Sequence, residues 1–352
     1  MSNPPRVEIA MVHIAKCGGT STTEMVRKLH ELGVLRLVGY SAADPQSGLQ
    51  TGEACLHSFT RQQRRADPAA PLLLGTVLRS PRAHVLSQYL YCHVLEHHLA
   101  HDAFPRADAP GGRTPADGFR LWLEHFDTRT WRHAAAEPAS TGAHNDYNCY
   151  NPTSMMARQL TCSLGRRGHN TSAHHVLGDE PAAATAPNAS EALLALNRMQ
   201  HVGLLELFLE SWCLLAWHAG AVTLPPSCDC RARQAAPRLA RTTEVHTNAI
   251  QEHAQLPALS LGALPAAVPP LIDALTEADQ LLYRAGAARV VRELRAAERA
   301  TGVPLLCPED LERLIDQTSY INGLEDELRA AAAEAGVEAE RTPQSRHDHA
   351  RG

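Results

Sequence analysis

The segment from Lys16 to Thr22 combines residue types that bind a phosphate or a sulfate. A glycine turn that precedes a helix exposes backbone N–H groups, and the helix N-terminus adds a partial positive charge. Three hydroxyls and one ammonium group accompany the glycines here, so all of them can converge on one oxyanion. A tight turn that needs glycine only for its backbone is the alternative. The candidate anion-binding residues are Lys16, Cys17, Gly18, Gly19, Thr20, Ser21 and Thr22.

The order of these residues differs from two common nucleotide-binding motifs. In an ATP-binding P-loop the lysine follows the glycines, whereas Lys16 precedes them. The segment also lacks the three spaced glycines of a dinucleotide-binding turn. Lys16 and Lys28 are the only lysines among 33 basic residues. A lysine directly before the glycine turn is therefore a candidate functional residue.

A second candidate anion site contains Arg79 and Ser87. Arg79 ends an apolar run, Pro81 suits the first turn of a helix, and Ser87 lies two helical turns beyond Ser80. An arginine at the carboxyl end of a buried strand faces the crevice in which α/β folds bind ligands. Two anion sites beside neighbouring strands suit a nucleotide phosphorylated at both ends.

The elements that must position these residues predict an α/β fold. Buried strands are expected at 7–14, 35–40, 72–78 and 201–205, and a helix is expected from about Met25 to Leu32. Further helices are expected at about 82–99, 119–126, 151–163, 207–217, 266–285 and 286–300. Residues 221–250 are expected to form a loop, and leucines between 311 and 328 give a weak coiled-coil pattern. We predict a main domain at 1–300, a C-terminal helical extension at 301–335 and a disordered tail at 336–352.

Composition excludes several classes of protein. The net charge of −5 and a pI near 6.5 argue against a nucleic-acid-binding protein, and 5% aromatic residues are too few for a platform of exposed rings. No apolar run reaches the roughly 18–20 residues of a membrane span, and the N-terminus lacks the pattern of a signal peptide. We therefore expect either a cytoplasmic protein or a chain that lacks an upstream membrane anchor.

Cysteines and two glycosylation sequons favour a secretory lumen. Cys213, Cys228 and Cys230 could contain a disulfide, with a metal site as the weaker alternative. The sequons begin at Asn170 and Asn188. The helical spacing of His93, His97 and His101 could suit zinc, but chance in a chain with 20 histidines, or the lining of an acceptor groove, explains it better. We expect no metal.

Two sequence segments resemble a known family. HIAKCGGTS and LRSPRAHVLSQY are similar to the paired motifs of sulfotransferases that use 3′-phosphoadenosine 5′-phosphosulfate (PAPS), in particular the Golgi heparan sulfate 2-O- and 6-O-sulfotransferases. Weaker similarities occur in NPTSMMARQLTC, HVGLLELFLESWCLL and LTEADQLLYRAGAARV. The chain departs from the family at His84, where another arginine is usual, at Cys17, where threonine is common, and in having no N-terminal membrane anchor.

The resemblance implies a fold, an activity and a location. It implies a P-loop-like three-layer fold, with the central parallel sheet flanked by helices, and a Golgi enzyme that transfers a sulfuryl group to a hydroxyl acceptor, best a glycan. The first segment would bind the 5′-phosphosulfate, and Arg79 and Ser87 the 3′-phosphate. Lys16 would neutralise the leaving oxygen, and His57 would be the general base. A histidine packed at a strand end is the alternative for His57.

Two other functions stay open at this stage. A P-loop-type nucleotide or small-molecule kinase would need an acidic residue at a strand end, where Glu206 is the candidate. A non-catalytic nucleotide-binding protein could use its C-terminal helix for partners. A tyrosyl peptide or a small alcohol is the alternative to a glycan as acceptor. The four arginines from Arg231 to Arg241 could attract an anionic acceptor, cover the nucleotide or lie in a solvated loop.

Overall fold

A computed structural model describes most of the elements expected from the sequence. The described residues are 8–14, 17–18, 21–22, 25, 28–29, 36–40, 72–94, 114–129, 152–161, 188–221, 223–235 and 259–341.

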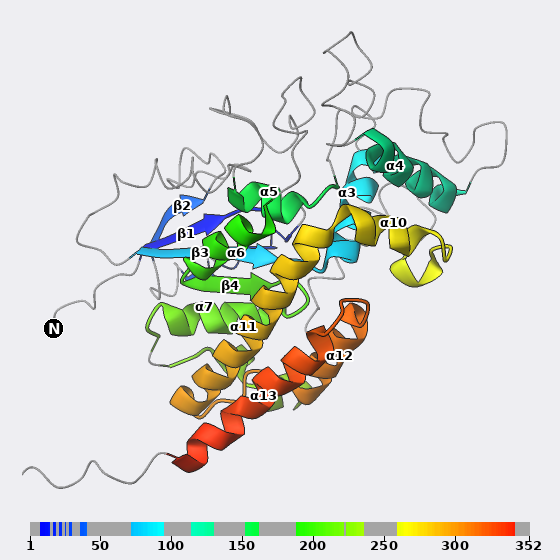
Figure 1. The fold of residues 1–352 in the computed structure, drawn as a ribbon. Coiled ribbons are helices and arrows are strands. Elements are labelled where there is room, and N and C mark those ends of the chain that lie inside the picture. The colour runs from blue at the N-terminus through cyan, green and yellow to red at the C-terminus, as the bar shows by residue number, and fades with distance from the viewer. Residues whose placement is uncertain are drawn as a thin grey trace, which may run out of the picture.

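Four parallel strands form one sheet in the order β2-β1-β3-β4 (Figure 1). Their bounds are Glu8–Val12 for β1, Arg36–Tyr40 for β2, Leu72–Leu78 for β3 and His201–Leu204 for β4. These strands confirm the four predicted ones, and the parallel sheet with its helices confirms the α/β class. β1 and β3 are neighbours in the sheet, with Glu8 opposite Leu72 and Val12 opposite Thr76. The two candidate anion segments therefore follow adjacent strands.

The bounds of the helices that precede or follow the strands agree in part with those predicted from the sequence. Ser21, Thr22, Met25, Lys28 and Leu29 are helical after β1. α3 spans Pro81–Val94, α4 Pro115–Arg129, α5 Met155–Thr161 and α7 Phe208–His218. Helix α6, Ala189–Asn197, is not predicted from the sequence. The side chain of Asn188 caps its N-terminus by accepting the N–H of Glu191.

The helices in the second half of the chain differ from several of the predicted bounds. Residues 221–250 are not all loop, because η4 spans Pro226–Cys228 and α8 spans Cys230–Ala235. After the short η5 (Leu261–Ala263), α10 (Val268–Leu275) and α11 (Glu277–Thr301) meet at Thr276, not near 285. The leucine pattern forms no continuous coiled coil but two helices, α12 (Pro308–Thr318) and α13 (Leu324–Arg341). α13 also continues past Gly336, where a tail was expected.

Helices cover both faces of the sheet at β4. A Cβ on Gly203 would lie 3.0 Å from the Cβ of Ser211 in α7, whereas a Cβ on Gly286 in α11 would lie 3.7 Å from Val202. Successive strand residues point to opposite faces, so α7 and α11 pack on opposite sides of β4. Gly286 lies in mid-helix because a side chain there would meet Leu78 at 2.5 Å.

Two hydrophobic clusters hold the molecule together. The larger joins β1, β3 and β4 to α5, α6, α7, α11, α12 and α13, and α13 lies along α11 in Figure 1. The smaller joins α3, α4 and α10 around the rings of Tyr89, Phe119, Trp122 and Phe126. The C-terminal helices therefore share the core of the sheet.

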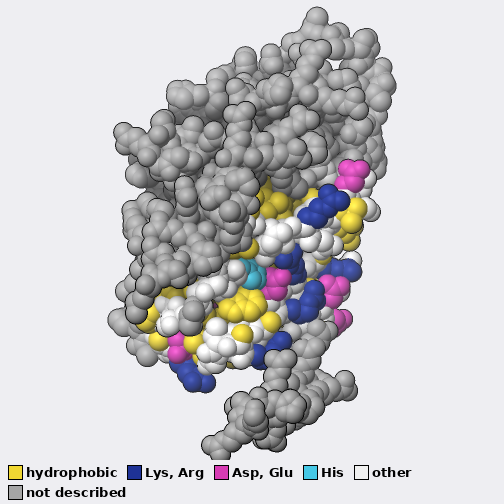
Figure 2. All heavy atoms as spheres, turned by 90° about the vertical axis from the view of Figure 1, so that its left-hand side faces the viewer, with side chains coloured by type: hydrophobic (Ala, Val, Ile, Leu, Met, Phe, Trp, Pro, Cys, Tyr) yellow, Lys and Arg dark blue, Asp and Glu magenta, His cyan; other side chains and the backbone are white. Residues whose placement is uncertain are grey.

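The outer surface carries charges of both signs. Figure 2 shows Arg side chains next to Asp and Glu side chains over the described part of one face. Among the described helices, none is both long enough and apolar enough to span a membrane.

Candidate functional site

The turn after β1 begins with Cys17 and Gly18. The N–H of Cys17 donates to the carbonyl of Ile14 (3.1 Å), and the N–H of Thr22 donates to the carbonyl of Gly18 (2.8 Å), which starts the helix. Gly18 has φ +79°, in the left-handed region, and a Cβ there would lie 2.6 Å from Cδ1 of Leu205. The left-handed backbone conformation favours glycine, and a Cβ there would also force the end of the Leu205 side chain to shift.

A small cavity next to this turn contains an unsatisfied hydroxyl. Thr22 is 3% exposed, and its Oγ1 has no hydrogen-bond partner within the described part of the chain. The cavity is lined by Met11, Val12, His13, Ile14, Cys17, Thr22 and Val77. Buried hydroxyls are nearly always hydrogen-bonded, so Thr22 offers a polar group to a ligand or a water. Ser21, the residue before it, is half-buried.

Cys17 links the first segment to the second. Its sulfur accepts a hydrogen bond from the backbone N–H of Arg79, and it is 1% exposed. Burial raises the pKa of the Cys17 thiol well above its ordinary value, although the nearby Arg79 charge acts in the opposite direction. The thiol is therefore neutral at pH 7 and serves the turn by packing.

Arg79 follows β3 directly and is partly buried. Burial lowers the pKa of its guanidinium below the ordinary value, and the neighbouring charge of Glu206 opposes that change. The residue is an arginine at the carboxyl end of a strand, as expected. Ser87 is half-buried and lies two turns into α3.

Glu206, two residues after the end of β4, hydrogen-bonds to the start of α3 and to α11. Its Oε1 accepts the N–H of Ser80 (2.8 Å), and its Oε2 accepts the hydroxyl of Tyr283 in α11 (2.9 Å). Burial, and then the charge of Glu206, raise the pKa of Tyr283, which stays a hydroxyl donor. Sequence reasoning considered Glu206 only as a kinase acid and missed Tyr283. The signal was present only as the weak similarity of the segments around 201–215 and 275–290.

Tyr320 and Asp273 also hold the start of α3, through Arg82. The N–H of Arg82 donates to the hydroxyl of Tyr320 (3.1 Å), and its guanidinium makes two hydrogen bonds to Asp273, of 2.8 and 2.5 Å. His84, at the position where the family usually has arginine, is 1% exposed and contacts the amide of Gln88 (3.1 Å). This position therefore faces the interior.

A buried carboxylate caps α5. Asp279 of α11 accepts the N–H of Met156 (3.2 Å) and of Ala157 (2.8 Å). Burial raises the pKa of Asp279 to about 7, although these hydrogen bonds and the charge of Arg158 act in the opposite direction. Burial also lowers the pKa of Arg158 to about 10. Two of the segments that resemble the family thus contact each other.

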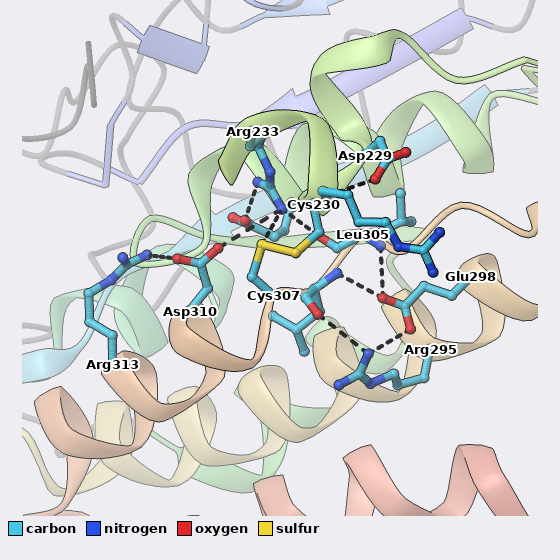
Figure 3. Close-up of a disulfide and its surroundings, with 12 residues drawn as sticks. Asp229, Cys230, Arg233, Arg295, Glu298, Leu305, Cys307, Asp310 and Arg313 are labelled. Atoms are coloured by element: carbon cyan, nitrogen blue, oxygen red, sulfur yellow. Dashed lines mark hydrogen bonds and ion pairs between the residues drawn. A yellow bond between two sulfur atoms is a disulfide. The ribbon is translucent and has the colours of Figure 1, made fainter. Parts of the chain in front are cut away.

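A third polar cluster lies around a disulfide (Figure 3). Cys230 is bonded to Cys307, and Arg233 makes an ion pair with Glu210 and donates to the carbonyl of Leu305 (2.6 Å). Burial raises the pKa of Glu210 to about 7, and Arg233 opposes this. Arg233 is therefore an internal structural residue, not part of a solvated loop or a nucleotide cover.

The predicted disulfide is confirmed between Cys213 and Cys228. The partner of Cys230 was not expected, because Cys307 lies 77 residues away. No group of three or more His, Cys, Asp or Glu side chains that could hold a metal occurs among the described residues.

Several predicted site residues lie outside the described residues: Lys16, Gly19, Thr20, His57, His97 and His101. The structure therefore brings together Cys17, Gly18, Thr22 and Arg79, and it adds Glu206 and Tyr283 to them. Comparisons with protein-family models, with curated proteins and with solved structures gave no match.

Proposed function

We propose that the chain is a PAPS-dependent sulfotransferase that transfers a sulfuryl group to a hydroxyl, best of a glycan. One observation carries the proposal: the two candidate anion segments follow adjacent parallel strands and touch through Cys17 and the N–H of Arg79. A nucleotide with a 5′-phosphosulfate and a 3′-phosphate needs two such anion sites side by side. The P-loop-like three-layer fold is part of the same proposal, supported by helices on both faces of β4.

The residues present fit the donor nucleotide. The left-handed Gly18 turn, the unsatisfied hydroxyl of Thr22 and the helix that follows supply donors to an oxyanion. Lys16, Gly19, Thr20 and Ser21 would add to this set. Arg79, with Ser87, would hold the 3′-phosphate through a charge-assisted hydrogen bond.

In this proposal catalysis comes from position and charge. The acceptor oxygen forms its bond to sulfur while the bond from sulfur to the bridging oxygen breaks, and adenosine 3′,5′-bisphosphate leaves. Lys16 neutralises the charge on the bridging oxygen, and His57 takes the acceptor proton. No residue in this scheme requires a metal.

The environment of Glu206 disfavours a P-loop kinase. Both carboxylate oxygens accept hydrogen bonds from protein donors, at 2.8 and 2.9 Å. A magnesium-binding acid at a strand end would instead direct an oxygen toward the metal and its water.

We also propose the Golgi lumen as the location. Two disulfides are typical of an oxidising compartment, and the sequon residue Asn188 is exposed. A cytoplasmic location is the alternative, and few disulfides persist there.

Calorimetry with three nucleotides tests the function. Adenosine 3′,5′-bisphosphate should bind far more tightly than AMP or ADP, because only it fills both anion sites. Arg79→Ala should weaken its binding by roughly 1.5–3 kcal/mol and leave AMP binding nearly unchanged, while Ser87→Ala should cost less. Equal affinities of the wild-type chain for the three nucleotides would contradict the proposal.

A further inference from the structure

The turn between α12 and α13 reaches the start of α3 through Tyr320. The hydroxyl of Tyr320 accepts the N–H of Arg82, across 238 residues of sequence, at 3.1 Å. The guanidinium carbon of Arg82 lies 3.9 Å from the centre of the Tyr320 ring. One side chain from the C-terminal helices thus contacts both the backbone and the side chain of the segment that carries Arg79.

Other contacts leave this segment little freedom. The Ser80 hydroxyl also hydrogen-bonds to Tyr320, and Asp273 holds the guanidinium of Arg82 by two hydrogen bonds. The N–H of Ser80 donates to Glu206. Pro81 has no N–H group. The N–H groups of Ser80 and Arg82 already donate to protein oxygens.

This arrangement assigns recognition of an anion to a side chain. Because the N–H groups of residues 80 and 82 donate to Glu206 and Tyr320, they are not offered to a ligand. The guanidinium of Arg79 must then supply the contact, and its direction depends on how the backbone of the next three residues is held. Tyr320 and Glu206 both hold that backbone by accepting its N–H groups.

We propose that Tyr320 is a positioning residue for Arg79, and that the helical pair α12–α13 therefore completes the site for the nucleotide 3′-phosphate. This rests on the proposed function, in which Arg79 binds that phosphate. It assigns a role in donor recognition to helices that otherwise only extend the core. The role is one of specificity: Tyr320 affects how well the protein distinguishes a nucleotide with a 3′-phosphate from one without it.

The test compares two nucleotides on two variants of the full chain. Tyr320→Phe removes the hydroxyl and keeps the ring, whereas Tyr320→Leu removes both. Calorimetry gives the dissociation constants of adenosine 3′,5′-bisphosphate and AMP. For Tyr320→Phe we expect roughly threefold to tenfold weaker binding of the bisphosphate, the effect of one lost hydrogen bond, and unchanged binding of AMP. Tyr320→Leu should lose more of the preference.

A matched variant on the same helical pair provides the control. Arg329 of α13 is exposed and makes ion pairs with Glu312 and Glu325. Arg329→Ala removes these exposed contacts and keeps Tyr320, so both affinities should stay within about twofold of the wild type, since exposed pairs contribute little. Thermal denaturation of each variant accompanies the binding measurement.

The possible outcomes separate the two proposals. A wild-type chain that binds both nucleotides equally overturns the proposed function and the role of Tyr320 with it. A wild-type chain that prefers the bisphosphate, together with Tyr320 variants that keep the full preference, overturns only the positioning role. Tyr320→Phe keeps the ring and therefore the packing. If it weakens the binding of both nucleotides equally, the positioning role is also overturned. A loss confined to the bisphosphate supports it.

Discussion

Gly18 occupies a place in the β1 turn that a residue with a side chain can hold only under strain. Its φ of +79° lies in the left-handed region, which costs an ordinary residue about 1–2 kcal/mol. The approach of Leu205 to 2.6 Å from an added Cβ is a second and separate obstacle. The turn is therefore fixed by the end of β4 as well as by its own backbone.

A pair of glycine substitutions separates these two costs. Gly220 has φ +82° and nothing within 4 Å of an added Cβ, so Gly220→Ala should lose only the conformational term of about 1–2 kcal/mol. Gly18→Ala should lose roughly 1–3 kcal/mol more, as overpacked sites do. Urea denaturation measures both values, and they should differ.

The double variant Gly18→Ala/Leu205→Ala checks the assignment. Removing the Leu205 side chain makes room for the new methyl, so the double variant should be more stable than the sum of the two single losses implies. Additive losses would show that Leu205 is not what constrains the turn.

The sequence could predict the residues of the site that lie in continuous motifs. Cys17, Gly18 and Arg79 stand where a strand ends and a helix begins, and local pattern is enough to place them there. Tyr283 of α11 and Tyr320 of the turn between α12 and α13 contact the site from positions that are distant in sequence. Nothing in their own neighbourhood indicates which strand end they reach, so only the packing of α11, α12 and α13 reveals them.

Asp279 joins α11 to the first turn of α5. A carboxylate at a helix N-terminus satisfies N–H groups that have no partner within the helix. The same carboxylate is 1% exposed, so burial destabilises its charged form. Its protonation and the stability of the fold are therefore linked.

The sign of that linkage can be tested. The pKa of Asp279 is about 7 in the folded chain and near its ordinary value of about 3.9 when unfolded. Between these values the folded state holds the proton more tightly, so this residue lowers the stability as pH rises from about 4 to 7, by about 1.4 kcal/mol per pH unit. Above pH 7 its contribution is constant.

Asp279→Asn isolates this effect. The wild type and the variant share all other titrating groups, including Glu210 and the half-buried His218, so the difference between their urea midpoints from pH 4 to 8 reports Asp279. We expect the stability of the wild type relative to the variant to fall with rising pH and then to level off near pH 7. A difference that does not change with pH would contradict the raised pKa.

Buried strands were the most predictable elements, because apolar β-branched runs between polar residues indicate parallel strands directly. α6 and α8 were missed for two reasons. α6 follows a stretch of alanine, proline and glycine, and its cap Asn188 was interpreted as a sequon in a loop. α8 is short, and a disulfide at Cys230 connects its first residue to the start of α12.

Two disulfides connect elements of one core in the described part of the chain. Cys213–Cys228 closes a separation of 15 residues, and Cys230–Cys307 one of 77 residues. The second bridge fixes the start of α12, the helix that leads to Tyr320. α12 and α13, which follow residue 300, share the larger hydrophobic core with the sheet.

Removing each bridge should destabilise the chain by different amounts. In the chain-entropy model Cys230→Ala/Cys307→Ala costs roughly 4.5 kcal/mol and Cys213→Ala/Cys228→Ala roughly 3 kcal/mol. Denaturation without reductant measures the losses. In excess dithiothreitol the wild type and both variants should become similar; differences that persist there would mean that the substitutions act by packing instead.

The single residue between Cys228 and Cys230 has a consequence for how the chain must be oxidised. Exchanging their partners would link Cys213 to Cys230 and Cys228 to Cys307, and each loop would lengthen by only two residues. Loop closure therefore hardly distinguishes the native pairing from the exchanged one. The correct choice depends on α7, α8 and α12 being packed before the sulfurs are joined. Oxidative refolding of the reduced, unfolded chain should then yield isomers with scrambled bridges, which a thiol–disulfide shuffling step would convert to the native form.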